Sequence, residues 1–115
     1  MNVVSKSNAL KHYQWGENCD GWNMVDESSL SVKLERMPPH TAEQKHLHQH
    51  AQQFFFILKG EAVFEIQQER VYVKSDQGIH IKDGLEHRIL NESNEDLEFI
   101  LSSQPSTYND RINIE

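Results

Sequence analysis

The feature that most constrains the fold is a succession of short strand-like segments between residues 30 and 102, each ended by turn-forming residues. The segment LSVKLERM (30–37) alternates apolar and polar residues, which is typical of a strand with one buried face. FFFILK (54–59) is apolar on both faces and indicates a strand covered on both sides. The later segments are EAVFEI (61–66), RVYVK (70–74), GIHIK (78–82), EHRIL (86–90) and LEFILS (97–102). Short, evenly spaced strands predict a sandwich or barrel, so we expect an all-β fold.

Composition and charge narrow the class of protein. The 115 residues fit one domain. Cys19 is the only cysteine, so no disulfide can form within the chain, and a reducing, cytoplasmic setting is expected. No apolar stretch approaches the length of a membrane span, and the start shows no signal-peptide pattern. The formal net charge is −7 without a basic run, which argues against a nucleic-acid partner.

We predict three parts in the chain: an N-terminal arm (1–21), a barrel (22–104) and a C-terminal tail (105–115) that packs on the barrel or on a partner subunit. Trp15, Cys19 and Trp22 lie in or beside the arm. They either cap the mouth of the barrel or serve as packing anchors. Arg111 either reaches a pocket or lies in an exposed tail.

One segment, TAEQKHLHQHAQQ (41–53), allows two interpretations. It is rich in helix-forming residues, and in a helix His46 and His50 would share one face. In a strand, His46 and His48 would point the same way. The strong strand signals on both sides favour an extended segment to about His48, followed by a loop that contains His50.

Two histidine elements lie far apart in the sequence but at characteristic spacings. Six of ten positions of a two-part motif agree with the chain: His46, His48, Gly60, Gly84, His87 and Asn91. Four positions depart from it: His40 and Asp76 replace glycines, Gln53 replaces a glutamate and Lys82 replaces a proline. Over roughly residues 30–102 the chain therefore resembles a cupin. The resemblance implies a jelly-roll β-barrel, also called a double-stranded β-helix.

The resemblance also implies a metal site formed by His46, His48 and His87. Three imidazole nitrogens leave open coordination positions on a divalent ion, as a catalytic site requires. The expected cofactor is one divalent transition metal per chain, and the residues do not choose among Fe, Mn, Ni, Cu and Zn. The alternative is a polar pocket that holds no metal.

Gln53 is the most informative departure from the motif. A glutamine offers a neutral carbonyl oxygen where a glutamate would cancel one charge of the ion. Such a site should act as a strong Lewis acid and prefer an anionic ligand. Gln53 is either the fourth ligand or a group that contacts the substrate or a bound water. Phe55, Ile57 and Trp22 are the candidates for lining the pocket.

Two classes of function follow. The first is a metal-dependent enzyme, such as a dioxygenase or isomerase, that acts on a small polar or anionic molecule. The second is a non-catalytic module that binds or senses a sugar or an organic acid. An enzyme needs an acid–base group near the metal, and the sequence offers only Tyr72 and Glu65, whose facing is uncertain. Fold alone does not decide the reaction.

The second apolar face of the strand at 54–59 predicts a subunit contact. Phe54, Phe56 and Leu58 point away from Phe55 and Ile57, and a small β domain has little else with which to cover them. We therefore expect a homodimer. His80 alternates with two isoleucines and is expected at the surface.

Overall fold

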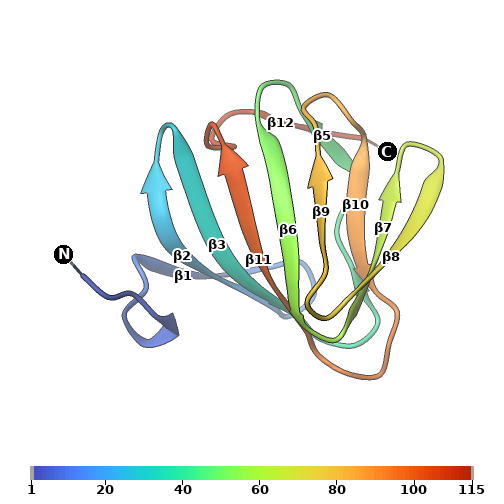
Figure 1. Cartoon of the computed structure of the whole chain (residues 1–115), viewed down its shortest axis with the longest axis horizontal. Coiled ribbons are helices and arrows are strands. Elements are labelled where there is room, and N and C mark those ends of the chain that lie inside the picture. Colours follow the sequence, from blue (N-terminus) through green and yellow to red (C-terminus); the bar gives the residue numbers. More distant parts are fainter. Residues whose placement is uncertain (1, 115) are drawn as a thin grey trace.

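The chain folds almost entirely into β-strands. The computed structural model describes residues 2–114 and contains one short 3₁₀ helix, η1 (Lys6–Asn8), which lies outside the sheets near the N-terminus (Figure 1). The strands are β1 (Lys11–Trp15), β2 (Cys19–Glu27), β3 (Leu30–Met37), β4 (Thr41–Ala42), β5 (His46–His48), β6 (Gln52–Lys59), β7 (Glu61–Ile66), β8 (Glu69–Lys74), β9 (Gly78–Ile81), β10 (His87–Asn91), β11 (Leu97–Gln104) and β12 (Arg111–Asn113).

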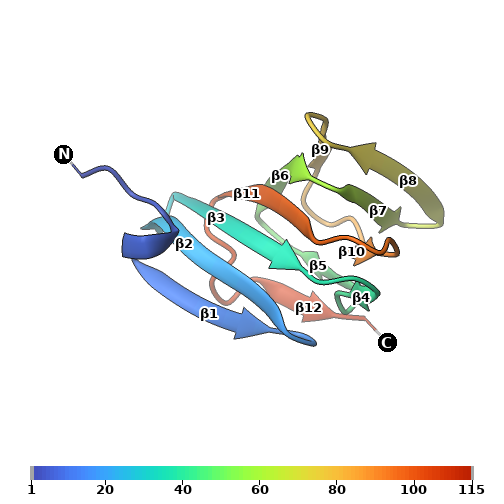
Figure 2. The same ribbon diagram turned by 90° about the horizontal axis from the view of Figure 1, so that it is seen from below.

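The strands form two antiparallel sheets (Figures 1 and 2). The first sheet has the order β1-β2-β3-β11-β6-β9, and the second has the order β12-β5-β10-β7-β8, with β4 paired to β10. Each sheet joins some consecutive strands, such as β2 and β3, to strands from distant parts of the sequence, as in β3-β11-β6. The expectation of an all-β jelly-roll barrel is confirmed.

Strand β6 shows how the core is built. Its side chains alternate, so that Gln53, Phe55 and Ile57 are buried while Gln52, Phe54 and Leu58 are exposed. Across the interior, the ring of Phe55 packs edge-on against Phe64 and is tilted against Phe99. The remaining core residues are Cys19, Met37, Ala62, Val73, Ile81, Ile89, Leu97 and Leu101.

Segment 41–53 is extended, which confirms the strand interpretation over the helical one. His46 of β5 pairs with His87 of β10, and the other edge of β5 pairs with β12. These ladders supply the backbone hydrogen-bond partners that a helix would have found internally, so the fold overrides the local helix propensity. His50 lies in the exposed bend after β5.

Both ends of the described chain join the sheets. β1 and β2 extend the first sheet beyond β3, and β12 forms the edge of the second sheet next to β5. Cys19 is buried in the core, and Trp15 packs against it. The division into arm, barrel and tail stays a prediction. Among residues 2–114, no helix is long and apolar enough to cross a membrane.

Asn91, the last position of the sequence motif, connects the segment after β3 to the loop between β10 and β11. Its side chain is fully buried at the end of β10. The amide nitrogen donates to the carbonyl oxygens of Met37 (3.0 Å), Pro38 (3.2 Å) and Glu95 (2.8 Å). The amide oxygen accepts from Ser93. Asn91 therefore satisfies backbone groups that would otherwise be buried without partners.

Candidate metal centre

Three histidines converge between the two sheets. His46 and His48 come from β5 and His87 comes from β10, and all three are buried. One nitrogen of each ring lies within 4.8 Å of the corresponding nitrogen of the others. The alternation of β5 turns both of its histidines inward, and the pairing of His46 with His87 brings the third ring alongside.

Hydrogen bonds fix the tautomer of each ring. The Nδ1 atoms of His46, His48 and His87 lie 2.8, 3.0 and 2.9 Å from the backbone carbonyl oxygens of Gln44, Asp110 and Leu85, respectively. A carbonyl oxygen can only accept, so each Nδ1 carries a hydrogen and donates it. Each Nε2 is therefore left with a free electron pair. This arrangement, in which the second ring nitrogen is held by a carbonyl, is the usual support for metal-binding histidines.

Gln53 turns its carbonyl oxygen toward this cluster. Its amide nitrogen donates to Ser103 Oγ at 3.1 Å, which leaves Oε1 at 3.1 Å from His87 Nε2. With Nδ1 of His87 protonated, these two atoms are both electron-pair donors, and a cation is what would bring them together. Ligands at about 2.1 Å from an ion and at right angles lie about 3.0 Å apart. The donor set therefore fits a divalent transition metal.

Burial keeps the histidines neutral. It lowers the pKa of His46 to about 3 and that of His87 to about 4, against the opposing effect of their hydrogen bonds to backbone carbonyls. Burial also lowers the pKa of His48. Neutral imidazole is the form that binds a metal ion, so the rings are ready for one at neutral pH.

A cavity of about 100 Å³ opens beside the histidines. Its lining residues come from both sheets: Lys33, Glu35, Glu43, His46, His48, Gln53, Phe55, Leu101, Thr107 and Arg111. Of the three side chains expected to line a pocket, Phe55 is among them. Ile57 lies in the core, in the row that contains Phe99 and Glu35. Trp22 lies elsewhere, stacked on His12 at 5.0 Å on the other face of the first sheet.

Two carboxyl groups in this cavity were missed by the sequence analysis. Glu35 of β3 accepts a 2.5 Å hydrogen bond from the hydroxyl of Tyr13, whose ring lies across Gly21. Glu43, between β4 and β5, has Oε2 at 3.7 Å from Arg111 Nη1 and Oε1 at 3.8 Å from His46 Nδ1. Burial raises the pKa of both carboxyl groups, to about 8 for Glu43.

The facing of β3 explains why Glu35 was missed. The strand alternates as expected, but its polar residues Ser31, Lys33 and Glu35 face inward, whereas Val32 and Leu34 face outward. An alternating pattern shows that a strand has two different faces, and the apolar face is usually assigned to the core. The residues considered earlier as acid–base groups lie elsewhere: Tyr72 is exposed, and Glu65 is paired with Arg70 and Arg88.

Two cationic side chains complete the wall of the cavity. Lys33 comes from β3, and Arg111 comes from β12 at the edge of the second sheet. Among the described residues, the Lys33 ammonium has no ion-pair partner within 4.0 Å, although it lies 5.7 Å from the centre of the Tyr13 ring. Ionisable groups of both signs therefore surround a small space beside the histidines.

A family model described as "Cupin domain" matches residues 33–103, which include all four donor residues. The chain belongs to the cupin family. A search of curated proteins finds no match. Among solved structures, a conserved protein with a double-stranded β-helix domain from Klebsiella pneumoniae is 16% identical, with a TM-score of 0.82, and the match covers 100% of this cupin and 98% of that chain.

Two further structures have enzyme names. A predicted oxalate decarboxylase from Thermotoga maritima is 21% identical, with a TM-score of 0.79 over 91% of this cupin and 100% of that chain. The polyketide cyclase RemF from Streptomyces resistomycificus is 13% identical, with a TM-score of 0.83 over 100% and 86%. At these identities the likeness shows the shared fold.

Proposed function

We propose that this cupin is a metal-dependent enzyme that acts on a small anionic molecule, with His46, His48, His87 and Gln53 as the metal ligands. The observation that carries the proposal is the donor set itself: three neutral imidazoles with fixed tautomers and a carbonyl oxygen, beside a cavity with ionisable walls. The ligands carry no charge, so a divalent ion would keep its full charge toward a substrate.

The cavity walls suggest a role for each charged residue. A bound metal would supply a Lewis acid that polarises an oxygen of the substrate. Lys33 and Arg111 would balance the negative charge of the substrate. Glu35 and Glu43 would exchange a proton with it, because both carboxyl groups line the same space.

These carboxyl groups favour an enzyme over the alternative, a non-catalytic module that binds a sugar or an organic acid. Binding an anion requires Lys33, Arg111 and the metal, and it gains nothing from two buried carboxyl groups nearby. An enzyme that transfers protons would use Glu35 and Glu43 as its acid–base groups. Saturable ligand binding without turnover by the metal-loaded protein would favour the binding module instead.

The first test is the metal content of the purified, untagged protein by elemental mass spectrometry. We expect about one transition metal per chain, with its loss in the His46→Ala/His48→Ala double variant. The matched control is His12→Ala/His80→Ala, because these two histidines are exposed and lie outside the cluster. If the wild type contains no metal and takes up none on reconstitution, the proposal is wrong.

The role of Gln53 has its own test, with an adjacent residue as control. Gln53→Glu supplies a charged oxygen at the same place, so the affinity for Zn²⁺ should increase. Gln52→Glu makes the same chemical change on the exposed face of β6 and should leave the affinity unchanged. If both variants bind Zn²⁺ as the wild type does, Gln53 is not a ligand.

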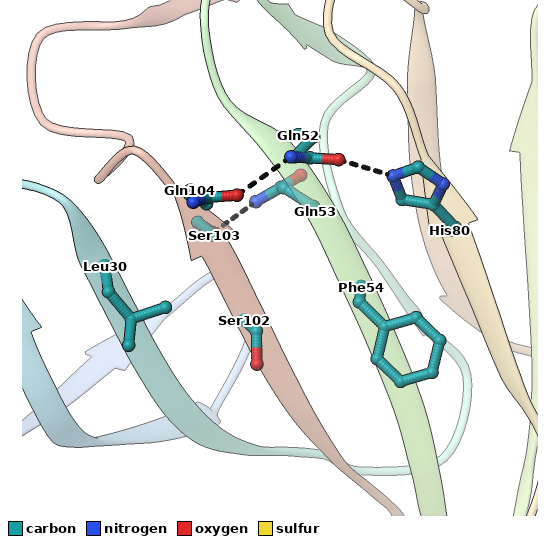
Figure 3. Close-up of a pocket in the computed structure, with 8 residues that line it drawn as sticks. All are labelled: Leu30, Gln52, Gln53, Phe54, His80, Ser102, Ser103 and Gln104. Atoms are coloured by element: carbon teal, nitrogen blue, oxygen red, sulfur yellow. Dashed lines mark hydrogen bonds between the residues drawn. The ribbon is translucent and has the colours of Figure 1, made fainter.

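We also propose that the outer face of the first sheet is a homodimer contact. Phe54 and Leu58 are 45% and 43% exposed on this face, and Leu30 lines the same shallow pocket as Phe54. Figure 3 shows Phe54 next to a hydrogen-bonded row in which Gln52 links Gln104 and His80 across three strands. Sedimentation velocity at micromolar concentration should give a dimer, and Phe54→Glu/Leu58→Lys should give a monomer.

The matched control for that variant is Tyr72→Glu, which places a charge on an exposed aromatic residue of β8 in the other sheet. The control should stay dimeric. A wild-type monomer would contradict this proposal without affecting the metal centre.

A further inference from the structure

Asp110 lies just before β12 and binds a loop that is far away in the sequence. The residue is only 7% exposed. The carboxylate accepts hydrogen bonds from three successive backbone amides, those of Gln49 (2.9 Å), His50 (3.0 Å) and Ala51 (2.8 Å). These residues form the bend that joins β5 to β6, between His48 and Gln53.

The backbone of the same residue holds one of the histidines. The carbonyl oxygen of Asp110 accepts the Nδ1 hydrogen of His48 at 3.0 Å, although the two residues are 62 positions apart. The next residue, Arg111, pairs with His48 in the ladder between β12 and β5. Asp110 thus contacts His48 through its carbonyl group and the following bend through its carboxylate.

The hydrogen bonds between the Asp110 carboxylate and the three amides are expected to be strong. Hydrogen bonds to an ionised carboxylate are shorter and stronger than those between neutral groups. Burial by itself would raise the pKa of Asp110, but the amides of Ala51, His50 and Gln49 outweigh it and keep the pKa below its ordinary value. The carboxylate therefore stays charged at neutral pH, and it gives hydrogen-bond partners to three successive amides of the bend, including that of the buried Ala51.

We propose that Asp110 is a positioning residue of the metal centre: its carbonyl oxygen fixes the tautomer of His48, and its carboxylate, by binding the bend at 49–51, keeps His48 and that carbonyl in register. The metal-binding part of this inference rests on the proposed function, whereas the positioning of the ring does not. Asp110 immediately precedes β12, whose first residue, Arg111, lines the cavity. The positions of the cupin motif do not include this residue.

The first experiment needs no metal. Imidazole ¹⁵N chemical shifts of the chelator-treated protein report which ring nitrogen of His48 carries the hydrogen. The wild type and the control Asp26→Asn, an exposed aspartate on β2, should show the Nδ1–H tautomer. Asp110→Ala should show a mixture, with faster amide exchange at residues 49–51. Asp110→Asn should be intermediate, because its amide oxygen still accepts while its nitrogen faces an N–H group.

The second experiment measures Co²⁺ binding to the same proteins by absorption spectroscopy, with circular dichroism to confirm that each is folded. Loss of a group that orients a metal ligand typically costs about 10- to 100-fold in affinity, and we expect that loss for Asp110→Ala and a smaller one for Asp110→Asn. If Asp110→Ala does not fold, Asp110→Asn still provides both readouts.

The outcomes separate the two proposals. A folded Asp110 variant with the wild-type tautomer and wild-type Co²⁺ affinity would overturn the role of Asp110. If the wild type binds no Co²⁺, the proposed metal function fails, and the tautomer of His48 alone decides the positioning role.

Discussion

Gly21 leaves the space through which Tyr13 reaches Glu35. The three residues lie in one row across β1, β2 and β3. A Cβ atom at Gly21 would overlap Cζ, Cε2 and Oη of the Tyr13 ring, so Gly21→Ala must push the ring aside. The ring would then lose its hydrogen bond to Glu35, and the buried carboxyl group would lose its donor.

The hydrogen bond between Tyr13 and Glu35 determines how much free energy of unfolding each substitution should remove. Leaving a buried acceptor without its donor costs about 1–3 kcal/mol, which is the expected loss for Tyr13→Phe. Gly21→Ala loses the same bond but gains about 0.4–1 kcal/mol from a less flexible unfolded chain, so its net loss should be about 1–2 kcal/mol. In the Gly21→Ala background, Tyr13→Phe should cost almost nothing further. The double variant should therefore be about 2 kcal/mol more stable than the sum of the single losses predicts.

Urea denaturation of the wild type, both single variants and the double variant measures this coupling. Tyr108→Phe is the matched control, because Tyr108 is 83% exposed and should cost under about 0.5 kcal/mol. The reasoning is refuted if Tyr13→Phe costs as much in the Gly21→Ala background as in the wild type. That result would mean that the ring stays on Glu35 despite the added methyl group.

Three further predictions concern the same cavity and the loops around it. Burial raises the pKa of the Glu35 carboxyl group in the folded protein above its unfolded value of about 4.3. The contribution of Glu35 to the free energy of unfolding is therefore largest below a pH of about 4.3 and falls as the pH rises through the folded-state pKa. Glu35→Gln should therefore gain stability relative to the wild type between pH 4 and pH 8 in urea denaturation, and a constant difference would contradict this. Asn91→Asp should lower the free energy of unfolding by about 3 kcal/mol or more at pH 7, because a carboxylate would face three carbonyl oxygens. Part of this loss should be recovered in acid. The control Asn94→Asp, at an exposed position, should change the stability little. Zn²⁺ at 100 times its dissociation constant should stabilise the wild type by about 2.7 kcal/mol in thermal unfolding but not His46→Ala/His48→Ala, and equal shifts would indicate binding elsewhere.

The sequence was most informative where the alternation of a strand determines which side chains share a face. The period-2 alternation of β6 predicted that Phe55 and Ile57 share one face and that Phe54 and Leu58 share the other. The structure buries the first face and leaves the second exposed, although the apolar run predicted a strand covered on both sides. The spacing of His46 and His48 predicted that both point the same way, and both point inward. These inferences need only the local geometry of a strand. The resemblance to cupins added His87, which local geometry could not have joined to the other two.

The rest of the cavity depends on information that a single strand does not contain. Glu35 faces a cavity lined by polar side chains from both sheets, and the alternating pattern of β3 is the same whichever face is inward. Tyr13 reaches Glu35 only because Gly21 lies between them on a different strand. Asp110 contacts the bend at 49–51 through a pairing of β12 with β5 that turn signals do not predict.

The two faces of β6 carry nearly the same chemistry. Gln52 and Gln53 are neighbours on opposite faces, as are Phe54 and Phe55. A strand that slipped by one residue would still present a glutamine to the histidines and an aromatic ring to the core, so the usual penalty against misregister is weak here. The alignment must instead come from the strand ends, above all from Gly60, where a φ of 86° and the nearby carbonyl of Asp96 leave no room for a side chain. A substitution at Gly60 could thus disturb the candidate metal centre from the opposite end of β6, because Gln52 in place of Gln53 would then face the histidines.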